Sequence, residues 1–412
     1  MCQDHKNTIL QTHHREKKFK LSDFFNDYWD TYAKSPKEFI RHEVYTAVRA
    51  IRACRTEVLG IEQYVCEECG EISEIYHSCK NRFCPTCSWT DTMKWAEKLQ
   101  YKMFNLKHRH VVFTLPHKIN GLIKRNDEKL LNILLQTTAD VFKDWMSVKY
   151  NIKPGIISVL HTFGEQKNFH VHVHMIVSWG GLDGDTKLLK EIKGEYVRYK
   201  FLQQKFRVKF EDRLVKLFDN KSLKHKFKDR ISFMRFLKQI NSKNWHLHIE
   251  PPIDNPVGVI RYIGRYSKRA CLSEYKITKM GNERISFEYK DYKNLDINGK
   301  PIVKEKDLHY TDFFPLLLQH VPFWRFRLVR YYGYYASASK IPDEFLFKPS
   351  EDDVLYSVNE KIEKASDLKT CSNCKIKKTY LFTIFKDNRI VYDAEYENMY
   401  SEIEAFWEKI VA

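Results

Sequence analysis

The chain has 412 residues, 43% of them hydrophobic, which excludes a wholly disordered protein and allows two or three domains with a core. Its 70 Lys and Arg residues against 53 Asp and Glu residues give a net charge of +17, which indicates an anionic partner, with nucleic acid as the leading candidate. The sequence shows no signal peptide and no apolar run of about eighteen residues, so we expect a soluble, cytoplasmic, nucleoid-associated protein without a membrane partner. Because thiols stay reduced in that compartment, the ten cysteines predict metal ligands rather than disulfides.

The first part of the chain predicts two helices behind a flexible basic arm, residues 1–20. Apolar residues at helical spacing begin at Leu21, with Ser22 as the candidate N-cap. A second helical pattern runs from about Pro36 to Leu59, and the glycine that follows is expected to end it.

Two Cys-x-x-Cys pairs follow these helices, separated by fourteen residues. Four thiolates from two such pairs can surround one structural Zn²⁺ tetrahedrally. The predicted zinc ligands are Cys66, Cys69, Cys84 and Cys87, with Cys79 as the alternate. His77 is also surplus to a site of four ligands, and either surplus residue could replace one of the four or serve a second ion.

Lys80 and Arg82 lie between the two cysteine pairs and would face DNA if this segment binds it. Together with the helices, the cysteines predict a helical, zinc-binding and DNA-binding domain over residues 21–106.

Residues 170–174 read His-Val-His-Val-His, and this alternation predicts a strand with imidazoles on one face and apolar side chains on the other. Further strands are predicted over residues 109–116 and 156–163, with a helix over residues 127–148 between them. Paired imidazoles on a rigid strand can hold a divalent ion, so metal coordination is favoured over solvated histidines at a sheet edge.

The polar connector after Gly164 predicts a hairpin between the second of these strands and the histidine strand. If Gly164 opposes Phe169, then His161 opposes His172 and both imidazoles share one face, whereas a shift of one residue would separate them. The predicted metal ligands are therefore His161, His172 and His174, with His170 as the alternate and Glu165 or Gln166 within reach from the loop.

The second half of the chain is more basic. Residues 187–243 predict a basic helical insertion, which could track phosphates or simply be solvated. Residues 257–269 predict a helix on which Tyr262 and Tyr266 share a face. The basic residues around this pair, proposed to bind DNA, are Arg261, Arg265, Lys268 and Arg269.

Residues 341–412 turn acidic and look like a separate appendage. They contain Cys371-x-x-Cys374, half of a zinc site, which either takes ligands from elsewhere in the chain or has no such role.

A series of short motifs stands in a fixed order between about residues 40 and 340. They are Ala53-Cys-Arg-Thr56, Ser78-Cys-Lys-Asn-Arg82 before Cys84-Pro-x-Cys87, His110-Val-Val-Phe-Thr-Leu-Pro-His117, Leu160-His-Thr-Phe-Gly164, the histidine strand, Gly180-Gly-Leu182, Arg261-Tyr-Ile-Gly-Arg-Tyr266 and Phe287-Glu-Tyr-Lys-Asp291. This series resembles that of rolling-circle insertion-sequence transposases of the HUH, double-tyrosine type, with an N-terminal transposase zinc-binding domain.

The resemblance implies that Tyr262 and Tyr266 are the catalytic tyrosines and that His172 and His174 are the two histidines of the HUH motif. It further implies nicking of single-stranded DNA at element ends, a 5′-phosphotyrosine intermediate, strand transfer, and Mg²⁺ or Mn²⁺ as the catalytic cofactor. Val171 stands where a proline is common and Phe83 where a histidine is common, and the latter weakens any histidine zinc ligand there.

The fold class that follows is α+β, an HUH endonuclease-like antiparallel sheet with flanking helices, preceded by a helical and zinc-knuckle domain. The nuclease domain is expected over residues 107–340, with the insertion at 187–243. Two readings compete with the transposase: a replication initiator or relaxase of the same chemistry, and a zinc-dependent DNA-binding protein without catalysis. A hydrolase that uses the histidines around zinc would differ from all of these by releasing a free 5′-phosphate.

Overall fold

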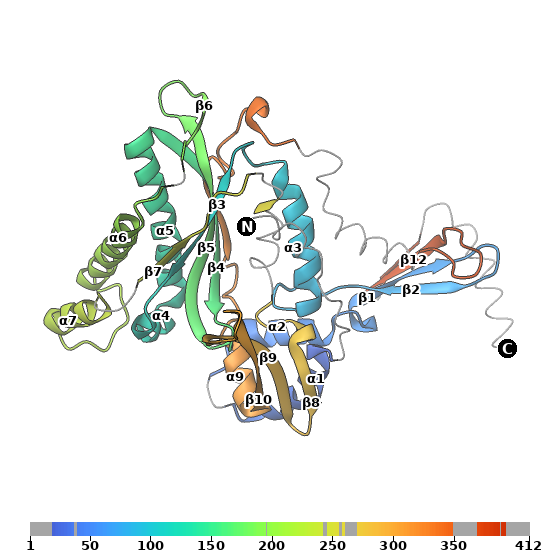
Figure 1. The fold of residues 1–412 in the computed structure, drawn as a ribbon. Helices are drawn as coiled ribbons and strands as arrows, with labels where there is room; N and C mark the ends of the chain where they lie inside the picture. The colour runs from blue at the N-terminus through green and yellow to red at the C-terminus, as the bar shows by residue number, and fades with distance from the viewer. Residues whose placement is uncertain are drawn as a thin grey trace.

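The computed structural model describes residues 19–36, 39–194, 196–241, 245–254, 258–259, 270–348, 369–387 and 389–392. They form antiparallel sheets flanked by helices, with cysteine clusters near the N-terminal helices, which confirms the predicted α+β class (Figure 1). Among the helices in these ranges, none has the length and apolar character needed to cross a membrane.

The central sheet has the strand order β11-β4-β5-β3-β7, and β6 pairs with the far end of β5. All of these pairs are antiparallel. The strands are β3 (His108–Thr114), β4 (Ile152–Phe163), β5 (Phe169–Asp183), β6 (Leu189–Glu191), β7 (His246–Ile249) and β11 (Val329–Gly333).

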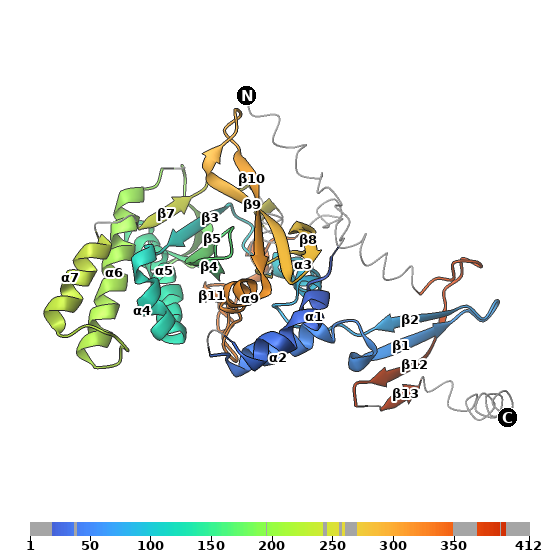
Figure 2. The ribbon, with the colours of Figure 1, turned by 90° about the horizontal axis from the view of Figure 1, so that it is seen from below.

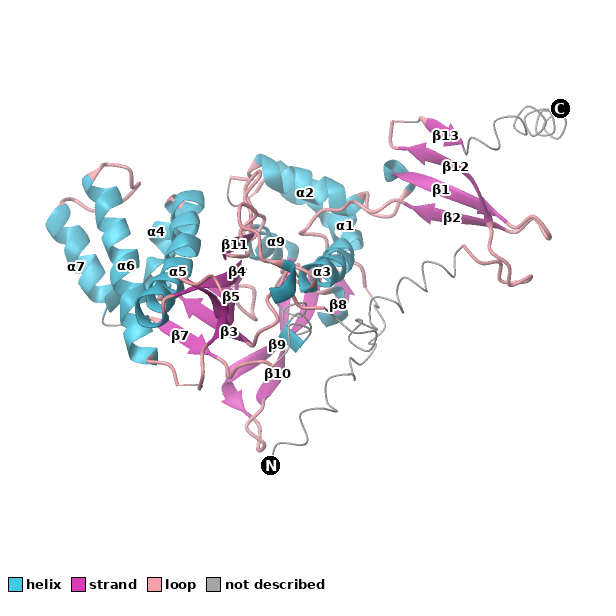
Figure 3. Cartoon of the chain, turned by 90° about the horizontal axis from the view of Figure 1, so that it is seen from above, coloured by secondary structure: helices cyan, strands magenta, loops and turns pink. Residues whose placement is uncertain are grey.

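Alternation along β5 divides its side chains between the two faces of the sheet. Val171, Val173 and Met175 join the main apolar core, whereas His172 and His174 lie on the opposite face. Four helices cover the apolar face (Figure 3). They are α4 (Asn120–Arg125), α5 (Asp127–Tyr150), α6 (Tyr199–Asp219) and α7 (Arg230–Asn241).

The histidine face of the sheet is covered from the other side by α3 (Pro85–Gln100). Ala96 and Leu99 of this helix join Ile157 and Ile176 of the sheet in a separate apolar cluster. The histidines of β4 and β5 therefore lie on the sheet face that is turned towards α3, a helix of the predicted zinc-binding segment.

The N-terminal helices share a core with a segment that lies more than 200 residues later in the chain. Phe25 stacks on Phe314 with ring centroids 5.2 Å apart, and the Leu21 amide donates to Glu274 Oε1 over 3.2 Å. The elements of this core include α1 (Leu21–Lys34), α2 (His42–Arg52), β8 (Ile277–Gly281), β9 (Arg284–Leu295), β10 (Pro301–His309) and α9 (Tyr310–Leu318). Elsewhere and beside it, the chain forms short 3-10 turns at Glu57–Leu59, His117–Ile119, Glu274–Lys276 and Asp343–Phe345.

A four-stranded sheet of order β13-β12-β1-β2 projects from the rest of the molecule (Figure 2). Its strands are β1 (Gly60–Val65), β2 (Ile72–Tyr76), β12 (Thr379–Phe385) and β13 (Ile390–Tyr392). The division of the chain into four segments stays a prediction, but two contacts cross its boundaries: this sheet joins the expected appendage to the zinc-binding segment, and the shared core joins α1 and α2 to α9.

The predicted extent of the second helix was wrong. The second helix covers only His42–Arg52 instead of reaching residue 59, because the chain turns at Arg55, whose φ is +59°. The third helix, α3, begins at Pro85, since proline suits the first position of a helix, where no amide donor is needed.

Candidate metal centres and active site

Three histidines from β4 and β5 form what we call the histidine cluster: His161, His172 and His174. His161 pairs directly with His172, as the hairpin argument predicted. Their ring centroids lie 5.2 Å apart, and those of His161 and His174 lie 4.7 Å apart. One ligand nitrogen from each of the three lies within 4.8 Å of the other two, which suits a single ion.

The predicted turn geometry differs by one residue from the structure. Phe163, not Gly164, pairs with Phe169, and an irregularity lies between Phe163 and His161. One extra residue on β5 absorbs the difference, as a β-bulge does, so the pairing of His161 with His172 is preserved.

Hydrogen bonds of the histidine rings indicate which nitrogens remain for an ion. His172 Nδ1 donates to the carbonyl of His170 over 3.0 Å. His174 Nδ1 lies 2.9 Å from His110 Nε2, and His110 Nδ1 lies 3.4 Å from a carboxylate oxygen of Glu250. Both cluster histidines of β5 thus keep Nε2 for a metal, with an outer partner that fixes the ring, as is usual at metal sites.

Burial keeps the β5 imidazoles neutral. Removal from water lowers the pKa of His172 and of His174 well below the ordinary value of 6.5, and the neighbouring His161 adds to the effect. A neutral imidazole offers the lone pair that a metal requires.

The alternate ligands are directed elsewhere. The ring of His170 packs against that of His117 at 5.0 Å and does not belong to the histidine cluster. Glu165 forms an ion pair with Lys276 at 3.0 Å. His110 and Glu250, by contrast, were not predicted as parts of the site. His110 belongs to the motif of residues 110–117, but only the pairing of β3 with β5 brings it next to His174.

Tyr262 and Tyr266, with Arg261, Arg265, Lys268 and Arg269, lie outside the described residues. The described residues on either side of them contact the histidine face. Val259 belongs to the apolar cluster of Ile157 and Ile176, and the Ala270 amide donates to Ser88 Oγ on α3 over 3.1 Å.

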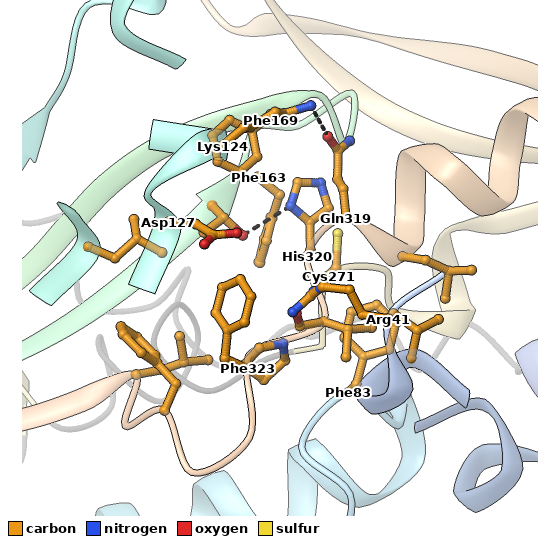
Figure 4. A pocket seen from close by; sticks show the side chains of 18 of the residues that line it. Arg41, Phe83, Lys124, Asp127, Phe163, Phe169, Cys271, Gln319, His320 and Phe323 are labelled. Carbon is orange, nitrogen blue, oxygen red and sulfur yellow. Dashed lines mark hydrogen bonds between the residues drawn. The ribbon is translucent and has the colours of Figure 1, made fainter. Parts of the chain in front are cut away.

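A cavity of about 390 Å³ opens beside the histidine cluster (Figure 4). Its lining includes His161 and Cys271 and the two cations Arg41 and Lys124. The guanidinium of Arg41 lies 4.2 Å from the centre of the Phe323 ring. Other aromatic side chains of the lining are Tyr32, Phe39, Phe83, Phe163, Phe169 and Phe326.

Of the two predicted DNA-contacting residues before α3, Lys80 is exposed, whereas Arg82 lines this cavity. Burial lowers the pKa of Arg82. Some basic residues of helix α6 form ion pairs with acidic residues of α5: Lys209 pairs with Asp144 at 2.7 Å, and Arg213 pairs with Asp140 at 2.5 Å.

The cysteines form two clusters, and the predicted grouping of four around one ion was wrong. The first cysteine cluster joins Cys84 and Cys87 to Cys54 and Cys79, with Sγ to Sγ distances of 3.4, 3.5 and 3.7 Å. The second cysteine cluster joins Cys66 and Cys69 to Cys371 and Cys374. Zinc bound tetrahedrally by four thiolates at about 2.3 Å places its sulfurs about 3.8 Å apart, which fits the first cluster.

The hairpin of β1 and β2 holds the first Cys-x-x-Cys pair away from the second. Ile61 pairs with Tyr76 at its base and Val65 with Ile72 near its tip, so the turn with Cys66 is carried away from the base. At about 3.3 Å per residue, strands of this length separate the two ends by about 16 Å, too far for one ion to bridge. Cys79, proposed as an alternate, is instead a full member of the first cluster.

Similar proteins define the class of this chain. The family model described as "Putative transposase" matches residues 155–342, and the model described as "Transposase zinc-binding domain" matches residues 24–115. The chain is thus similar to transposases over its histidine-bearing sheet and to their zinc-binding domain over its cysteine-rich segment, and a transposase implies DNA as the partner.

These two matches, with the relatives that follow, support a transposase of the insertion-sequence type with a zinc-binding domain. It is 27% identical over 323 residues to "Putative transposase y4qJ" of Sinorhizobium fredii, which covers 76% of this chain and 80% of that protein. It is 28% identical over 300 residues to "Transposase for insertion sequence element IS801" of Pseudomonas savastanoi pv. phaseolicola, which covers 72% of this chain and 70% of that protein. No solved structure matches the chain significantly. The zinc-binding match and the cysteine clusters together support structural Zn²⁺.

Proposed function

We propose that this transposase nicks single-stranded DNA at the ends of its element with a tyrosine nucleophile and transfers the resulting strand. The observation that carries the proposal is the histidine cluster, one buried and two partly buried imidazoles whose ligand nitrogens lie close together on a rigid sheet. A zinc-dependent DNA-binding protein without catalysis has no need for such a cluster.

His161, His172 and His174 would hold Mg²⁺ or Mn²⁺, leaving other coordination positions for the phosphate oxygens and water that these cations prefer. When bound there, such an ion would supply Lewis-acid chemistry to the scissile phosphate. His110 and Glu250 then act as positioning residues for His174.

The nucleophile is the hydroxyl of Tyr262 or Tyr266. Its oxygen attacks the phosphorus as its proton leaves, the bond to the 3′ oxygen breaks, and that oxygen takes up a proton. The products are a 5′-phosphotyrosine and a free 3′-hydroxyl, and a later 3′-hydroxyl attack on the phosphotyrosine transfers the strand. Support comes from the chain flanking these tyrosines, because Val259 and Cys271 both lie at the histidine face or the adjoining cavity.

The cavity beside His161 suits an unpaired nucleotide. Aromatic side chains of its lining offer stacking surfaces, and Arg41, Lys124 and Arg82, which also line it, supply positive charge. Lys80 and the basic residues at 261, 265, 268 and 269 are proposed to contact the DNA backbone. Nucleoid association would follow from the same affinity for DNA.

The proposal is tested by incubating the full chain with single-stranded oligonucleotides of element-end sequence and Mn²⁺. We expect a covalent protein–DNA adduct that is lost in Tyr262→Phe or Tyr266→Phe and strongly reduced in His172→Ala. An oligonucleotide cleaved with a free 5′-phosphate in both tyrosine variants would instead identify a metal-dependent hydrolase. DNA binding without adduct under any metal would identify the non-catalytic protein, and activity restricted to a plasmid origin would favour a replication initiator or relaxase.

A further inference from the structure

The second cysteine cluster lies in two segments about 300 residues apart, and the zinc-binding family match, residues 24–115, contains only one of them. Cys66 and Cys69 stand at the tip of the hairpin of β1 and β2, and Cys371 and Cys374 directly precede β12. Cys69 Sγ and Cys371 Sγ lie 3.4 Å apart, and the four sulfurs all lie within 4.8 Å of one another. These spacings bracket the distance of about 3.8 Å expected between thiolates that share a tetrahedral Zn²⁺.

The two Cys-x-x-Cys turns have the same backbone hydrogen bonds. The Cys66 amide donates to the Glu71 carbonyl over 2.9 Å, and the Gly70 amide donates to the Cys66 carbonyl over 2.8 Å. The second turn repeats both bonds with the same spacing in sequence. The Cys371 amide donates to the carbonyl of Ile376, five residues later, over 2.8 Å, and the Lys375 amide donates to the carbonyl of Cys371, four residues earlier, over 3.1 Å.

Each turn is closed by a left-handed residue at the same position, Gly70 with a φ of +73° and Lys375 with a φ of +58°. A left-handed conformation is costly for lysine, which carries a Cβ, so an unconstrained loop would rarely adopt it. Two matched turns that aim four thiols at one point indicate a pair of zinc knuckles.

The strands that carry the knuckles are paired. β1 and β12 run antiparallel from Gly60 opposite Phe385 to Val65 opposite Thr379. The ring of Tyr64 meets that of Tyr380 edge-on, with centroids 5.6 Å apart.

Charge supports the same pairing. Residues 60–76 contain five Glu and no Lys or Arg, whereas residues 369–386 contain five Lys and no Asp or Glu. Lys378, whose side chain is only 1% exposed, pairs with Glu71 at 3.0 Å, and Lys369 reaches Glu62 at 3.9 Å. A buried lysine needs a charge partner, so this contact belongs to a permanent interface rather than to a chance encounter of two tails.

We propose that Cys66, Cys69, Cys371 and Cys374 bind a second structural Zn²⁺ that fastens the C-terminal segment, residues 369–392, to the N-terminal zinc-binding segment. The chain thus carries two Zn²⁺ ions: one at the base of the hairpin, in the first cysteine cluster, and one at its tip. The ion at the tip links β1 and β2 to β12 in the projecting four-stranded sheet, whose strands come from segments about 300 residues apart in the chain. This inference does not depend on the proposed nuclease activity.

The test is the zinc content of the purified full chain, measured by mass spectrometry of the metal for the wild type and for the double variant Cys371→Ser/Cys374→Ser. We expect the double variant to lose one zinc ion per chain. The matched control is Cys271→Ala, which removes a buried cysteine that belongs to neither cluster and is expected to keep the wild-type zinc content. Unchanged zinc in the double variant would overturn the proposal.

A second measurement needs no variant and so is independent of any folding defect. The wild-type chain is alkylated with and without a zinc chelator, and modified cysteines are identified by peptide mass spectrometry. We expect Cys66, Cys69, Cys371 and Cys374 to be protected together and to become reactive together when zinc is removed. Equal reactivity of Cys371 and Cys374 under both conditions, or a Cys69–Cys371 disulfide in the purified chain, would contradict the zinc site.

Discussion

Replacing His110 by alanine tests whether the outer partner of the histidine cluster matters for metal binding. His110 is buried, its ring lies within 15° of parallel to that of His174, and its Nε2 lies 2.9 Å from His174 Nδ1. Loss of such a partner typically weakens metal affinity by about 10- to 100-fold, or about 1.4 to 2.8 kcal/mol. We therefore expect His110→Ala to need about 10 to 100 times more Mn²⁺ for half-maximal adduct formation.

The assay is a Mn²⁺ titration of adduct formation on a single-stranded oligonucleotide. His248→Ala is the matched control, because this exposed histidine also approaches Glu250, at 3.7 Å, but does not contact the cluster. It should leave the Mn²⁺ dependence unchanged. His110→Gln, which retains a hydrogen-bonding group, should lie between the two. An unaltered Mn²⁺ dependence in a folded His110→Ala protein would refute the positioning role.

Three further predictions concern stability and zinc. Burial lowers the pKa of His320 from 6.5 to about 4, so the unfolded chain binds a proton at this residue more readily than the folded chain does. The contribution of neutral His320 to the free energy of unfolding is therefore fully present above pH 6.5 and is lost as the pH falls towards 4. Up to about 3 kcal/mol is at stake, and His320→Gln should flatten the dependence of the unfolding free energy between pH 4 and 6.5. Gly333 has a φ of +61°, and an added Cβ would meet the Pro154 carbonyl, so Gly333→Ala should destabilise the chain by about 2 kcal/mol or more in a denaturant titration. Cys84→Ser should remove the ion of the first cysteine cluster and lower the melting temperature by loosening α3 from α2, as thermal unfolding with and without a chelator would show.

Each of these predictions has an outcome that would contradict it, and the glycine prediction also has a control variant. Gly299 also has a positive φ, +71°, but an added Cβ there would meet nothing within 4 Å, so Gly299→Ala should cost about 1 kcal/mol from strain alone. Equal costs at both glycines would contradict the clash with Pro154. For the pH prediction, a His320→Gln protein with the same pH profile as the wild type would show that another group, such as buried His108, dominates. A Cys84→Ser chain with wild-type zinc content would exclude the first cluster as a zinc site.

Much of the histidine cluster could be predicted from sequence, because its geometry is local. A strand alternates its side chains with a period of two, and a hairpin pairs residues at a nearly constant sum of their numbers. Together these placed His161 opposite His172, and the bulge near the turn changed only the residues beyond it. The role of His110 was not predicted, because β3 comes from an earlier part of the chain and a local sequence pattern does not reveal which strands are neighbours in a sheet.

The sequence by itself predicted that paired cysteines bind metal and determined that residues 170–174 form a strand with one imidazole face, since spacing and periodicity are properties of short segments. Only the tertiary structure decided which cysteine pairs lie together. The β1–β2 hairpin holds its two ends apart, so that nearby Cys69 and Cys84 belong to different clusters while Cys69 and Cys371 meet. It also decided that α1 and α2 complete their core with α9. The physical reason in both cases is that contacts between distant segments depend on how whole elements pack, and a local pattern cannot encode them.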